Sequence, residues 1–289
     1  MVQGDENFRM IHELKITALV DNTSGAYDLL GEWGLSLWIE ADNHRVLFDT
    51  GKGRTLTSNA RLLGIDLKDA GALVVSHGHF DHTGGIAEAL ASGFRGKVYA
   101  HPWVLMRRYE RREKPPHREV GMPARSLEAL RSRNEDFIGS SGPAEIAPGL
   151  IVTGAIPRQT DFEDTGGLFF LDEACTQPDP LVDDQALLIR TQQGLVVIVG
   201  CCHAGVVNTL DYAAALTGDC RIRAVVGGLH LRHASKQRLK GTVDYMKRIG
   251  VRTISACHCT GFDAVVYLQN HLDAEMLTLG AGLSLRFTE

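Results

Sequence analysis

Short apolar runs, bounded by glycine, aspartate or asparagine, recur along the whole chain. Their length and their content of valine, isoleucine and leucine are typical of buried strands. They cover residues 14–20, 35–40, 46–48, 73–75, 97–100, 150–152, 168–171, 186–189, 195–199, 224–226, 253–255 and 284–287. Between several of these runs, apolar positions spaced three and four apart predict helices. The helical stretches are residues 55–63, 85–90, 206–216, 237–249 and 263–272.

The order of these elements predicts a mixed α/β chain with one shared core. Early strands follow one another as in hairpins, whereas later strands alternate with helices. Such a pattern is typical of sheets that pack together and are covered by helices on the outside. No fixed-period repeat, low-complexity tract or long linker divides the sequence. We therefore expect residues 1–289 to form a single domain.

Composition narrows the classes of function. The 289 residues include 30 Lys+Arg against 35 Asp+Glu, a net charge of -5, which offers no overall positive field to nucleic acid. The longest apolar runs are strand-sized, so no membrane-spanning segment is expected. Six cysteines show no pattern of a small disulfide-linked domain, which indicates reduced thiols. We expect a cytoplasmic protein that acts on a small anionic molecule. Whether the chain forms a homo-oligomer stays open.

One segment departs from the alternation of strands and helices. Within residues 107–118, six basic residues and two glutamates lie close together, and a short helical stretch follows at 126–131. We expect a basic helical insertion, or lid, over about residues 103–147. Its charged residues either form a solvent-exposed helix face or bring arginines such as Arg107 to a substrate. Guanidinium groups pair with phosphate oxygens through two hydrogen bonds, so a phosphate is the group expected for such a lid.

The strongest chemical signal follows the predicted strand at residues 73–75. His77, His79, Asp81 and His82 lie within six consecutive positions. His77 and His79 are two apart on an extended segment, so both project to one side and can share a metal ion. Asp81 and His82, at the following turn, can face a second ion nearby. Burial of four such groups together is unfavourable unless a cation collects them.

Two further histidines follow predicted strands. The strand at 195–199 runs into Gly-Cys-Cys-His-Ala-Gly, which contains His203, and the strand at 253–255 leads to Cys-His-Cys, which contains His258. Both histidines are candidate metal ligands. The four cysteines of these turns could instead hold a structural zinc ion. Adjacent cysteines fit tetrahedral geometry poorly, however, and the usual two-residue spacer is absent from the sequence.

The motif His-x-His-x-Asp-His after an apolar strand, with Phe-Asp-Thr-Gly at residues 48–51, resembles the metallo-β-lactamase superfamily of metallohydrolases. The resemblance spans essentially the whole chain. It implies an α+β fold, a four-layer αββα sandwich with one or two metal ions at the strand ends. Shorter motifs also resemble one subfamily, at residues 21–25, 33–36, 200–205, 227–231 and 258–261. Its members are labelled 7,8-dihydropterin-6-methyl-4-(β-D-ribofuranosyl)aminobenzene-5'-phosphate synthases.

The resemblance also implies ligands that this chain lacks. Residues 154–159 stand where a mid-chain histidine ligand is expected, and residues 200–203, Gly-Cys-Cys-His, stand where a metal-bridging aspartate is expected. We predict two sets of metal ligands, His77, His79 and His203 for one ion and Asp81, His82 and His258 for the other. Whether His203 or the thiolate of Cys201 takes the place of the missing bridging carboxylate stays open. Zinc is the first expectation, and iron, manganese or nickel also suit imidazole ligands.

Further residues are expected to support the centre. Aspartic proteases need two Asp-Thr-Gly carboxylates and this chain has one, so Asp49 either hydrogen-bonds a metal-ligating histidine or is an ordinary turn residue. Cys201 is expected beside the ligands as well. His230, after a glycine turn, is a candidate for proton transfer or substrate contact, or a structural histidine. Arg158 and His101 are further candidates for substrate binding, or else Arg158 is a solvated surface residue and His101 an ordinary residue at the end of a strand.

Together these residues predict a metal-dependent hydrolase. A metal-activated water would attack a small phosphate-bearing or other anionic ester, with Asp81 orienting the water. Arg232, His233 and Lys236 are additional candidate contacts of the anionic group. Two alternatives stay open. One is a di-iron redox enzyme on the same fold, which usually has more carboxylate ligands, and the other is a non-catalytic metal- or ligand-binding module.

Overall fold

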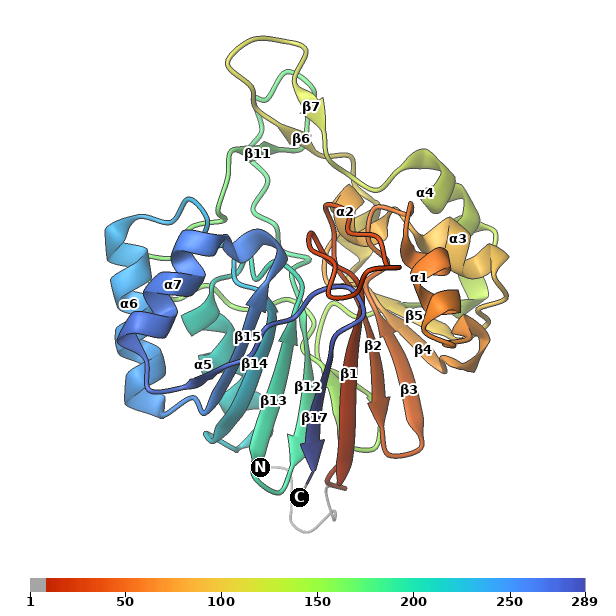
Figure 1. Cartoon of the computed structure of the whole chain (residues 1–289). Coiled ribbons are helices and arrows are strands. Elements are labelled where there is room, and N and C mark those ends of the chain that lie inside the picture. Colours follow the sequence, from red (N-terminus) through yellow and green to blue (C-terminus); the bar gives the residue numbers. More distant parts are fainter. Residues whose placement is uncertain (1–8, 289) are drawn as a thin grey trace.

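A computed structural model describes residues 9–288 of the chain. Two seven-stranded sheets face each other and carry helices on their outer faces, with a small three-stranded sheet at one end (Figure 1). The layers follow the order helix, sheet, sheet, helix, which confirms the predicted α+β sandwich. Among the described helices, none has the length and apolar character that a membrane crossing requires.

The first sheet combines an antiparallel half with a parallel half, in the order β17-β1-β2-β3-β4-β5-β8. Its strands are β1 (Glu13–Val20), β2 (Ser36–Ala41), β3 (His44–Phe48), β4 (Ala72–Val74), β5 (Lys97–Ala100), β8 (Phe137–Gly139) and β17 (Ser284–Thr288). β1, β2 and β3 form an antiparallel meander, whereas β3, β4, β5 and β8 run parallel. Helices α1 (Leu56–Leu62), α3 (Ile86–Ala91) and α4 (Ala124–Arg131) cover its outer face.

The second sheet has the order β16-β15-β14-β13-β12-β10-β9. Its strands are β9 (Ala144–Ala147), β10 (Leu150–Val152), β12 (Ala186–Thr191), β13 (Gly194–Val199), β14 (Ile222–Gly228), β15 (Thr253–Cys257) and β16 (Glu275–Met276). The last four run parallel, so they end at the same edge of the sheet. Helices α5 (Val206–Thr217), α6 (Lys236–Ile249) and α7 (Phe262–His271) cover the outer face.

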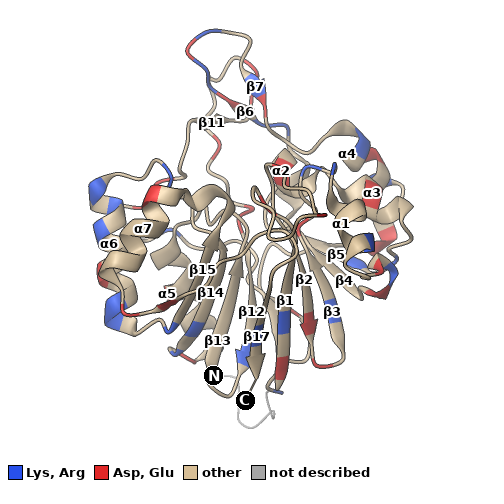
Figure 2. Ribbon diagram, in the orientation of Figure 1, with Lys and Arg blue, Asp and Glu red and all other residues tan. Residues whose placement is uncertain are grey.

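Apolar side chains from both sheets fill the space between them. Ile16 and Ile39 of the first sheet and Ile189 and Ile198 of the second belong to one continuous buried cluster. Two further clusters join each sheet to its own helices. β13 is buried on both faces, which explains its uninterrupted apolar run. Charged side chains gather instead on the outer helices and on the strand ends farthest from the small sheet (Figure 2).

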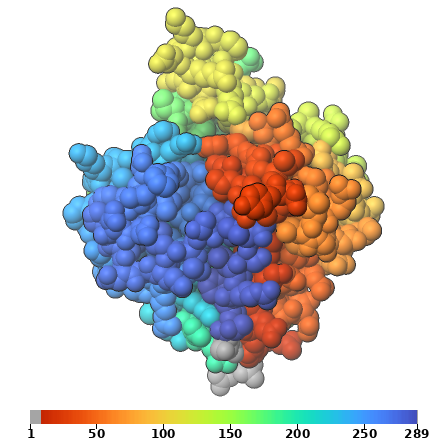
Figure 3. Space-filling model, in the orientation of Figure 1, coloured from red at the N-terminus to blue at the C-terminus, as the bar shows by residue number. Residues whose placement is uncertain are grey.

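The basic segment forms a β-hairpin rather than the predicted helix. β6 (Tyr109–Glu110) and β7 (Arg118–Glu119) pair with each other, and β11 (Phe169–Phe170) pairs with β6. This small sheet projects from one end of the molecule (Figures 1 and 3). Pro115 and Pro116 lie between the two hairpin strands, and consecutive prolines do not continue a helix. The predicted helical stretch at 126–131 falls within α4.

Arg108, at the base of the hairpin, is fully buried between two aspartates. Its Nε lies 2.8 Å from Oδ2 of Asp179, and its Nη1 donates to Oδ2 of Asp183 at 2.7 Å. The same oxygen of Asp183 accepts a hydrogen bond from the backbone N–H of Gly78 at 2.8 Å. This ion pair therefore joins the hairpin to the loop at residues 76–82, which carries the first four predicted metal ligands.

We expect Arg108→Met to lower the free energy of unfolding by about 3–5 kcal/mol, because it leaves two carboxylates buried without their counter-charge. The matched control is Arg107→Met, since Arg107 pairs with Glu119 on the surface, where its side chain is 71% exposed. A surface pair of this kind contributes about 1 kcal/mol or less. Urea denaturation of the metal-free protein measures both changes. Equal losses in the two variants would contradict the buried role of Arg108.

Candidate metal centre

Loops that follow strands of both sheets meet at one end of the sandwich. Residues 75–79 follow β4 and lead into α2 (Phe80–Thr83), a single helical turn. Residues 200–205 follow β13, and residues 258–260 follow β15. Because parallel strands end at the same edge of a sheet, these loops bring together side chains that lie far apart in the sequence.

The three histidines predicted for one metal ion lie together. His77, His79 and His203 are buried, and their candidate ligand atoms lie within 4.8 Å of one another. The Nε2 of His77 is 3.0 Å from the Nδ1 of His79, a separation that two metal–nitrogen bonds of about 2.0–2.1 Å can span. His203 therefore supplies a third imidazole to this group.

The residues predicted for a second metal ion form an adjoining group. Asp81, His82 and His258 are buried, and their candidate ligand atoms also lie within 4.8 Å of one another. The Nε2 of His258 lies 3.5 Å from Oδ2 of Asp81. The rings of His77 and His82, one from each group, have centroids 4.2 Å apart. The two groups are therefore neighbours in a single cluster.

Neighbouring oxygens fix the orientation of the imidazoles. Carbonyl and carboxylate oxygens only accept hydrogen bonds, so a ring nitrogen that contacts one carries the proton. Three such contacts involve Nδ1: His82 with Asp49 at 2.7 Å, His203 with the carbonyl of Thr165 at 2.7 Å, and His258 with the side-chain carbonyl of Asn22 at 3.0 Å. Each ring is left with Nε2 as its ligand nitrogen, the usual arrangement of metal-binding histidines.

Two of the assigned ligand nitrogens are buried without a hydrogen bond. The Nε2 atoms of His203 and His258 make none with any residue in the range 9–288. An unsatisfied buried polar atom costs about 1–3 kcal/mol, and a coordinated cation at the centre removes such a cost. The donor set of five imidazoles and one carboxylate suits zinc, iron, manganese or nickel. The residues of both groups therefore fit divalent metal ions.

Burial and neighbouring charges set the protonation of the ligands. Burial lowers the pKa of His79 to about 3 and the pKa values of His77 and His203 well below their ordinary range. These rings are therefore neutral, which is the form that binds a cation. Burial alone would raise the pKa of Asp81, but the neighbouring imidazoles, that of His258 first, hold it below the usual range. This carboxylate is thus ionised.

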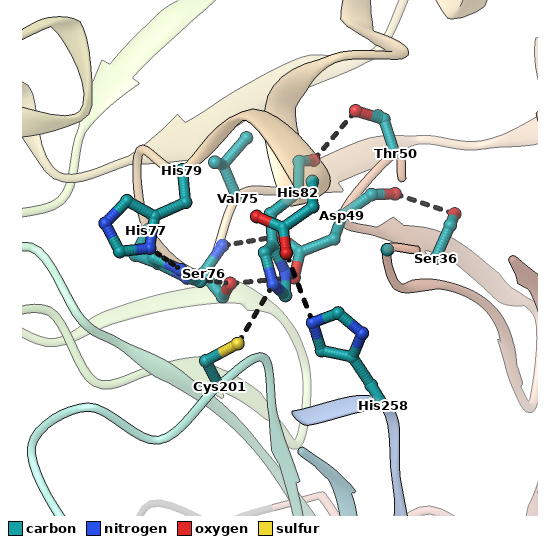
Figure 4. A network of polar contacts seen from close by, with 12 residues as sticks. Ser36, Asp49, Thr50, Val75, Ser76, His77, His79, His82, Cys201 and His258 are labelled. Atoms are coloured by element: carbon teal, nitrogen blue, oxygen red, sulfur yellow. Dashed lines mark hydrogen bonds and ion pairs between the residues drawn. The ribbon is translucent and has the colours of Figure 1, made fainter. Parts of the chain in front are cut away.

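Asp49 anchors the loop that carries the first ligands (Figure 4). Its buried carboxylate accepts hydrogen bonds from the backbone N–H of Ser76, the Oγ of Ser76 and the Nδ1 of His82, each at 2.7 Å. Although burial lowers the pKa of His82, Asp49 raises it to about 9, so a cation at Nε2 has to displace a proton. These contacts are those that the sequence predicts for a carboxylate that orients a metal ligand.

Four non-glycine residues around the centre adopt left-handed backbone conformations. The φ angle is 57° at Asp49, 56° at Cys202, 49° at His230 and 50° at His258. Such conformations cost about 1–3 kcal/mol each and persist only where the surroundings hold them, as they do at binding sites. The loops therefore give up local backbone stability to position the residues of this centre.

The four cysteines of the two turns do not form the alternative zinc site. Cys257 belongs to the core between the sheets, whereas Cys202 belongs to the core beneath the helices on the other side of the second sheet. Cys201 and Cys259 instead line a cavity above the metal centre. The Sγ of Cys201 lies 3.1 Å from the Nε2 of His82, and it is also close to a histidine of the first group. This thiol therefore lies between the two ligand groups.

The cavity above the ligand groups has a volume of about 430 Å³ and combines aromatic with cationic walls. The guanidinium of Arg118 lies 4.7 Å from the ring centroid of Phe80, and that of Arg232 lies 5.2 Å from the ring centroid of Trp33. His233 lines the same cavity. Glu110, which also lines the cavity, lies 3.6 Å from Arg118, so the guanidinium of Arg232 is the cationic group of the wall that has no carboxylate partner among the described ion pairs.

Three residues predicted to contact substrate have other positions. Arg158 donates to the backbone carbonyls of His203 at 2.7 Å and Glu163 at 3.1 Å, so it holds a ligand loop. His101 is buried at the end of β5, and Arg107 forms its ion pair on the outside of the hairpin. None of these three is among the described residues that line the cavity.

Other predicted residues do reach the cavity. His230 lines it, and the centroid of its ring lies 4.4 Å from that of His203. Arg232 and His233 follow the glycine turn that the sequence singles out, and both are on the cavity wall. Sequence reasoning misses Arg118, because nothing in the basic run distinguishes it from its neighbours. It also misses Trp33, although this residue begins one of the short subfamily motifs.

Comparisons with known proteins agree with the geometry. Residues 34–258 match the profile of the metallo-beta-lactamase superfamily. The chain is 29% identical to the 7,8-dihydropterin-6-methyl-4-(beta-D-ribofuranosyl)-aminobenzene-5'-phosphate synthase of Methanocaldococcus jannaschii, over 97% of this chain and 99% of that relative. The crystal structure of Tm1679, a metal-dependent hydrolase of the beta-lactamase superfamily, is similar at 31% identity and a TM-score of 0.80, over 96% of this chain and 100% of that one.

A more distant structure shares the fold alone. Zinc-bound PqqB from Methylobacterium extorquens is 13% identical, with a TM-score of 0.56 over 94% of this chain and 99% of that one. The profile match covers most of the sequence, from the residues that precede β2 to His258 at the second ligand group. It confirms the resemblance that the motifs indicate. The chain belongs to the metallo-beta-lactamase superfamily.

Proposed function

We propose that the protein is a metal-dependent hydrolase of small anionic esters, with phosphate esters as the first class. The observation that carries the proposal is the position of two metal-ligand groups beneath a cavity with cationic walls. Membership of the superfamily and similarity to a metal-dependent hydrolase support it.

Two groups of residues would hold the metal ions, His77, His79 and His203 in one and Asp81, His82 and His258 in the other. A divalent cation in such a site lowers the pKa of a coordinated water toward neutrality and draws charge from the bond under attack. Imidazole with one carboxylate suits zinc first, with iron, manganese or nickel as alternatives.

Asp81 is the group placed to orient the attacking water. Its carboxylate is ionised and lines the cavity. An ionised carboxylate at the cavity surface accepts a hydrogen bond from water and so aligns it with the ester. The helical turn α2 that carries Asp81 is itself held in place, because the Oγ of Thr50 donates to the backbone carbonyl of His82 at 2.8 Å.

Two pairs of arginine and aromatic side chains are placed to bind the anionic part of the substrate. Arg118 lies over Phe80, and Arg232 lies over Trp33. The aromatic faces hold the guanidinium planes and leave N–H groups at their edges for phosphate oxygens. Nη1 of Arg118 already lies 3.6 Å from Oε2 of Glu110, so Arg232 is the stronger candidate for the anion. The rings of the cavity wall, including Phe169, also suit a flat organic group attached to that phosphate.

A second candidate function is a synthase reaction on a phosphate-bearing substrate. The relative from M. jannaschii is named for the synthesis of a dihydropterin compound that bears a 5'-phosphate, and the identity extends over 97% of this chain. The aromatic walls of the cavity suit a flat heterocycle as well as an aryl ester. A synthase joins two substrates, whereas a hydrolase consumes one substrate and water, so product analysis distinguishes the two reactions.

The ligand set favours hydrolysis over the redox alternative. Within the described part of the chain, Asp81 is the one carboxylate of the two ligand groups. Di-iron carboxylate sites, by contrast, take most of their ligands from glutamates. We therefore rank ester hydrolysis ahead of di-iron chemistry and of a non-catalytic binding module.

We expect His79→Ala and Asp81→Ala each to abolish metal binding at its own group and ester hydrolysis, because each variant removes one of three ligands. Plasma mass spectrometry of the dialysed protein measures the metal content, and turnover of an aryl phosphate measures activity. The control is His271→Ala, which removes an exposed imidazole that stacks on Tyr267. Full turnover by metal-depleted His79→Ala protein would exclude the proposed mechanism.

We expect Arg232→Ala to lower kcat/KM for an anionic aryl phosphate by about 10- to 100-fold, mainly through KM, since a charged hydrogen bond contributes roughly 1.5–3 kcal/mol. Turnover of a neutral aryl acetate should change little. Arg248→Ala is the matched control, because Arg248 also lies over an aromatic ring, that of Tyr245, but on the outer helix α6. Equal losses on both esters would show that Arg232 supports the fold rather than the anion.

A further inference from the structure

Cys201, His230 and Cys259 form a third group of potential ligands. Their candidate ligand atoms lie within 4.8 Å of one another, and all three residues line the cavity above the metal centre. None of them belongs to the two groups assigned above. Cys201 is also close to His77 and His82, whereas His230 and Cys259 appear in no other candidate group of the described residues. Neither proposed metal ion explains why two thiols and an imidazole meet here.

Three neighbouring strands each supply one member of this group. β13, β14 and β15 run parallel and side by side, and Cys201, His230 and Cys259 each follow the end of one of them. The carboxyl edge of the sheet therefore places the three side chains next to one another. Gly228, the last residue of β14, leaves the room required, because a Cβ there would lie 2.5 Å from Sγ of Cys259 and 2.5 Å from the carbonyl oxygen of Gly200.

His230 is oriented in the manner of a metal-binding histidine. Its Nε2 donates to the carbonyl of Gly166 at 3.2 Å, and its Nδ1 is buried with no hydrogen-bond partner between residues 9 and 288. His203 shows the same division, since its Nδ1 donates to the carbonyl of Thr165 and its Nε2 is buried and unpartnered in the described structure. Two consecutive carbonyls of one loop thus fix one nitrogen of each ring and leave the other for a cation.

Gly166 makes this contact with His230 possible. Its φ angle is 81°, in the left-handed region that glycine adopts without strain. A Cβ at this position would lie 2.0 Å from the ring of His230. The close approach of backbone and imidazole is therefore built into the loop, as expected where a ring has to be held in one orientation.

We propose that Cys201, His230 and Cys259 bind a third, thiophilic cation such as zinc. Two thiolates and one imidazole are a donor set that binds zinc and leaves a fourth position open to water or substrate. Both thiols are free and buried, so they are available as ligands. The site gives His230 a ligand role in place of the proton-transfer role that the sequence predicts, and it does not depend on which ester the enzyme cleaves.

The competing arrangement uses Cys201 alone. Its Sγ lies 3.1 Å from the Nε2 of His82, and it is within 4.8 Å of the candidate ligand atoms of both His82 and His77. A single thiolate that bridges the two imidazole-rich sites, in place of the missing aspartate, would need neither His230 nor Cys259. The two arrangements therefore differ in the number of cations and in the role of Cys259.

Cobalt(II) distinguishes them, because thiolate ligands give cobalt a near-ultraviolet charge-transfer absorption that imidazole and carboxylate ligands do not. We expect the full-length protein, loaded with cobalt(II) without oxygen and dialysed, to hold three ions per chain. Cys259→Ser and His230→Gln should each hold two, and Cys259→Ser should lose about half or more of the charge-transfer intensity, as one of two thiolates is removed. Cys220→Ser, which replaces an exposed thiol, should match the wild-type protein.

Two ions in the wild-type protein, with an absorption that Cys201→Ser removes and Cys259→Ser leaves unchanged, would overturn the proposal in favour of a bridging thiolate. No thiolate absorption in the wild-type protein would overturn it as well. Circular dichroism identifies any variant that has lost its fold, and His230→Gln then tests the same site without altering a thiol. Three bound ions in a protein that cleaves no ester would reject the proposed hydrolase and retain the third site.

Discussion

The burial of five imidazoles and one ionised carboxylate at the strand ends is the constraint on which the rest of the structure depends. Removal from water lowers the pKa values of His77, His79 and His203, so these three rings are neutral. Only a fixed frame of hydrogen bonds keeps them facing one another. Asp49 is the centre of that frame, because it binds the loop backbone through Ser76 and also the ring of His82.

Two adjacent aspartates, Asp183 and Asp184, belong to the same frame and connect the ligand loops of the two sheets. Asp183 accepts the backbone N–H of Gly78, in the loop after β4, and is itself held by Arg108. Asp184 accepts the backbone N–H of Ala204 at 2.7 Å, in the loop after β13. One short segment before β12 therefore fixes both ligand loops relative to each other. Asp184 is buried at this junction, and its burial raises the pKa of the carboxyl to about 7.

The features that the sequence predicts are local ones. The apolar runs and the ligands at residues 77–82 are each contained in a few consecutive positions, so period and spacing suffice to find them. The hairpin depends on the pairing of β6 with β11, about sixty residues later in the chain, and such a distant pairing leaves no local pattern in the sequence. The burial of Arg108 is unpredictable for the same reason, because its partner Asp179 is also far along the chain. The predicted insertion also ends earlier than expected, because β8 and β9 join the two main sheets. Cys259 and Cys201 lie near each other because β13 and β15 both pair in parallel with β14 and end at the same edge of the sheet.

The two departures from the superfamily pattern have a common structural basis. The segment at 154–159 lacks the expected histidine, but its Arg158 donates to the backbone carbonyl of His203 at 2.7 Å. The segment thus positions an imidazole that it does not itself carry. The loop after β13 carries both that imidazole and Cys201, two residues earlier, whose thiol lies between the ligand groups. The hydrogen bond from Arg158 therefore holds the one loop that brings both an imidazole and a thiol to the centre.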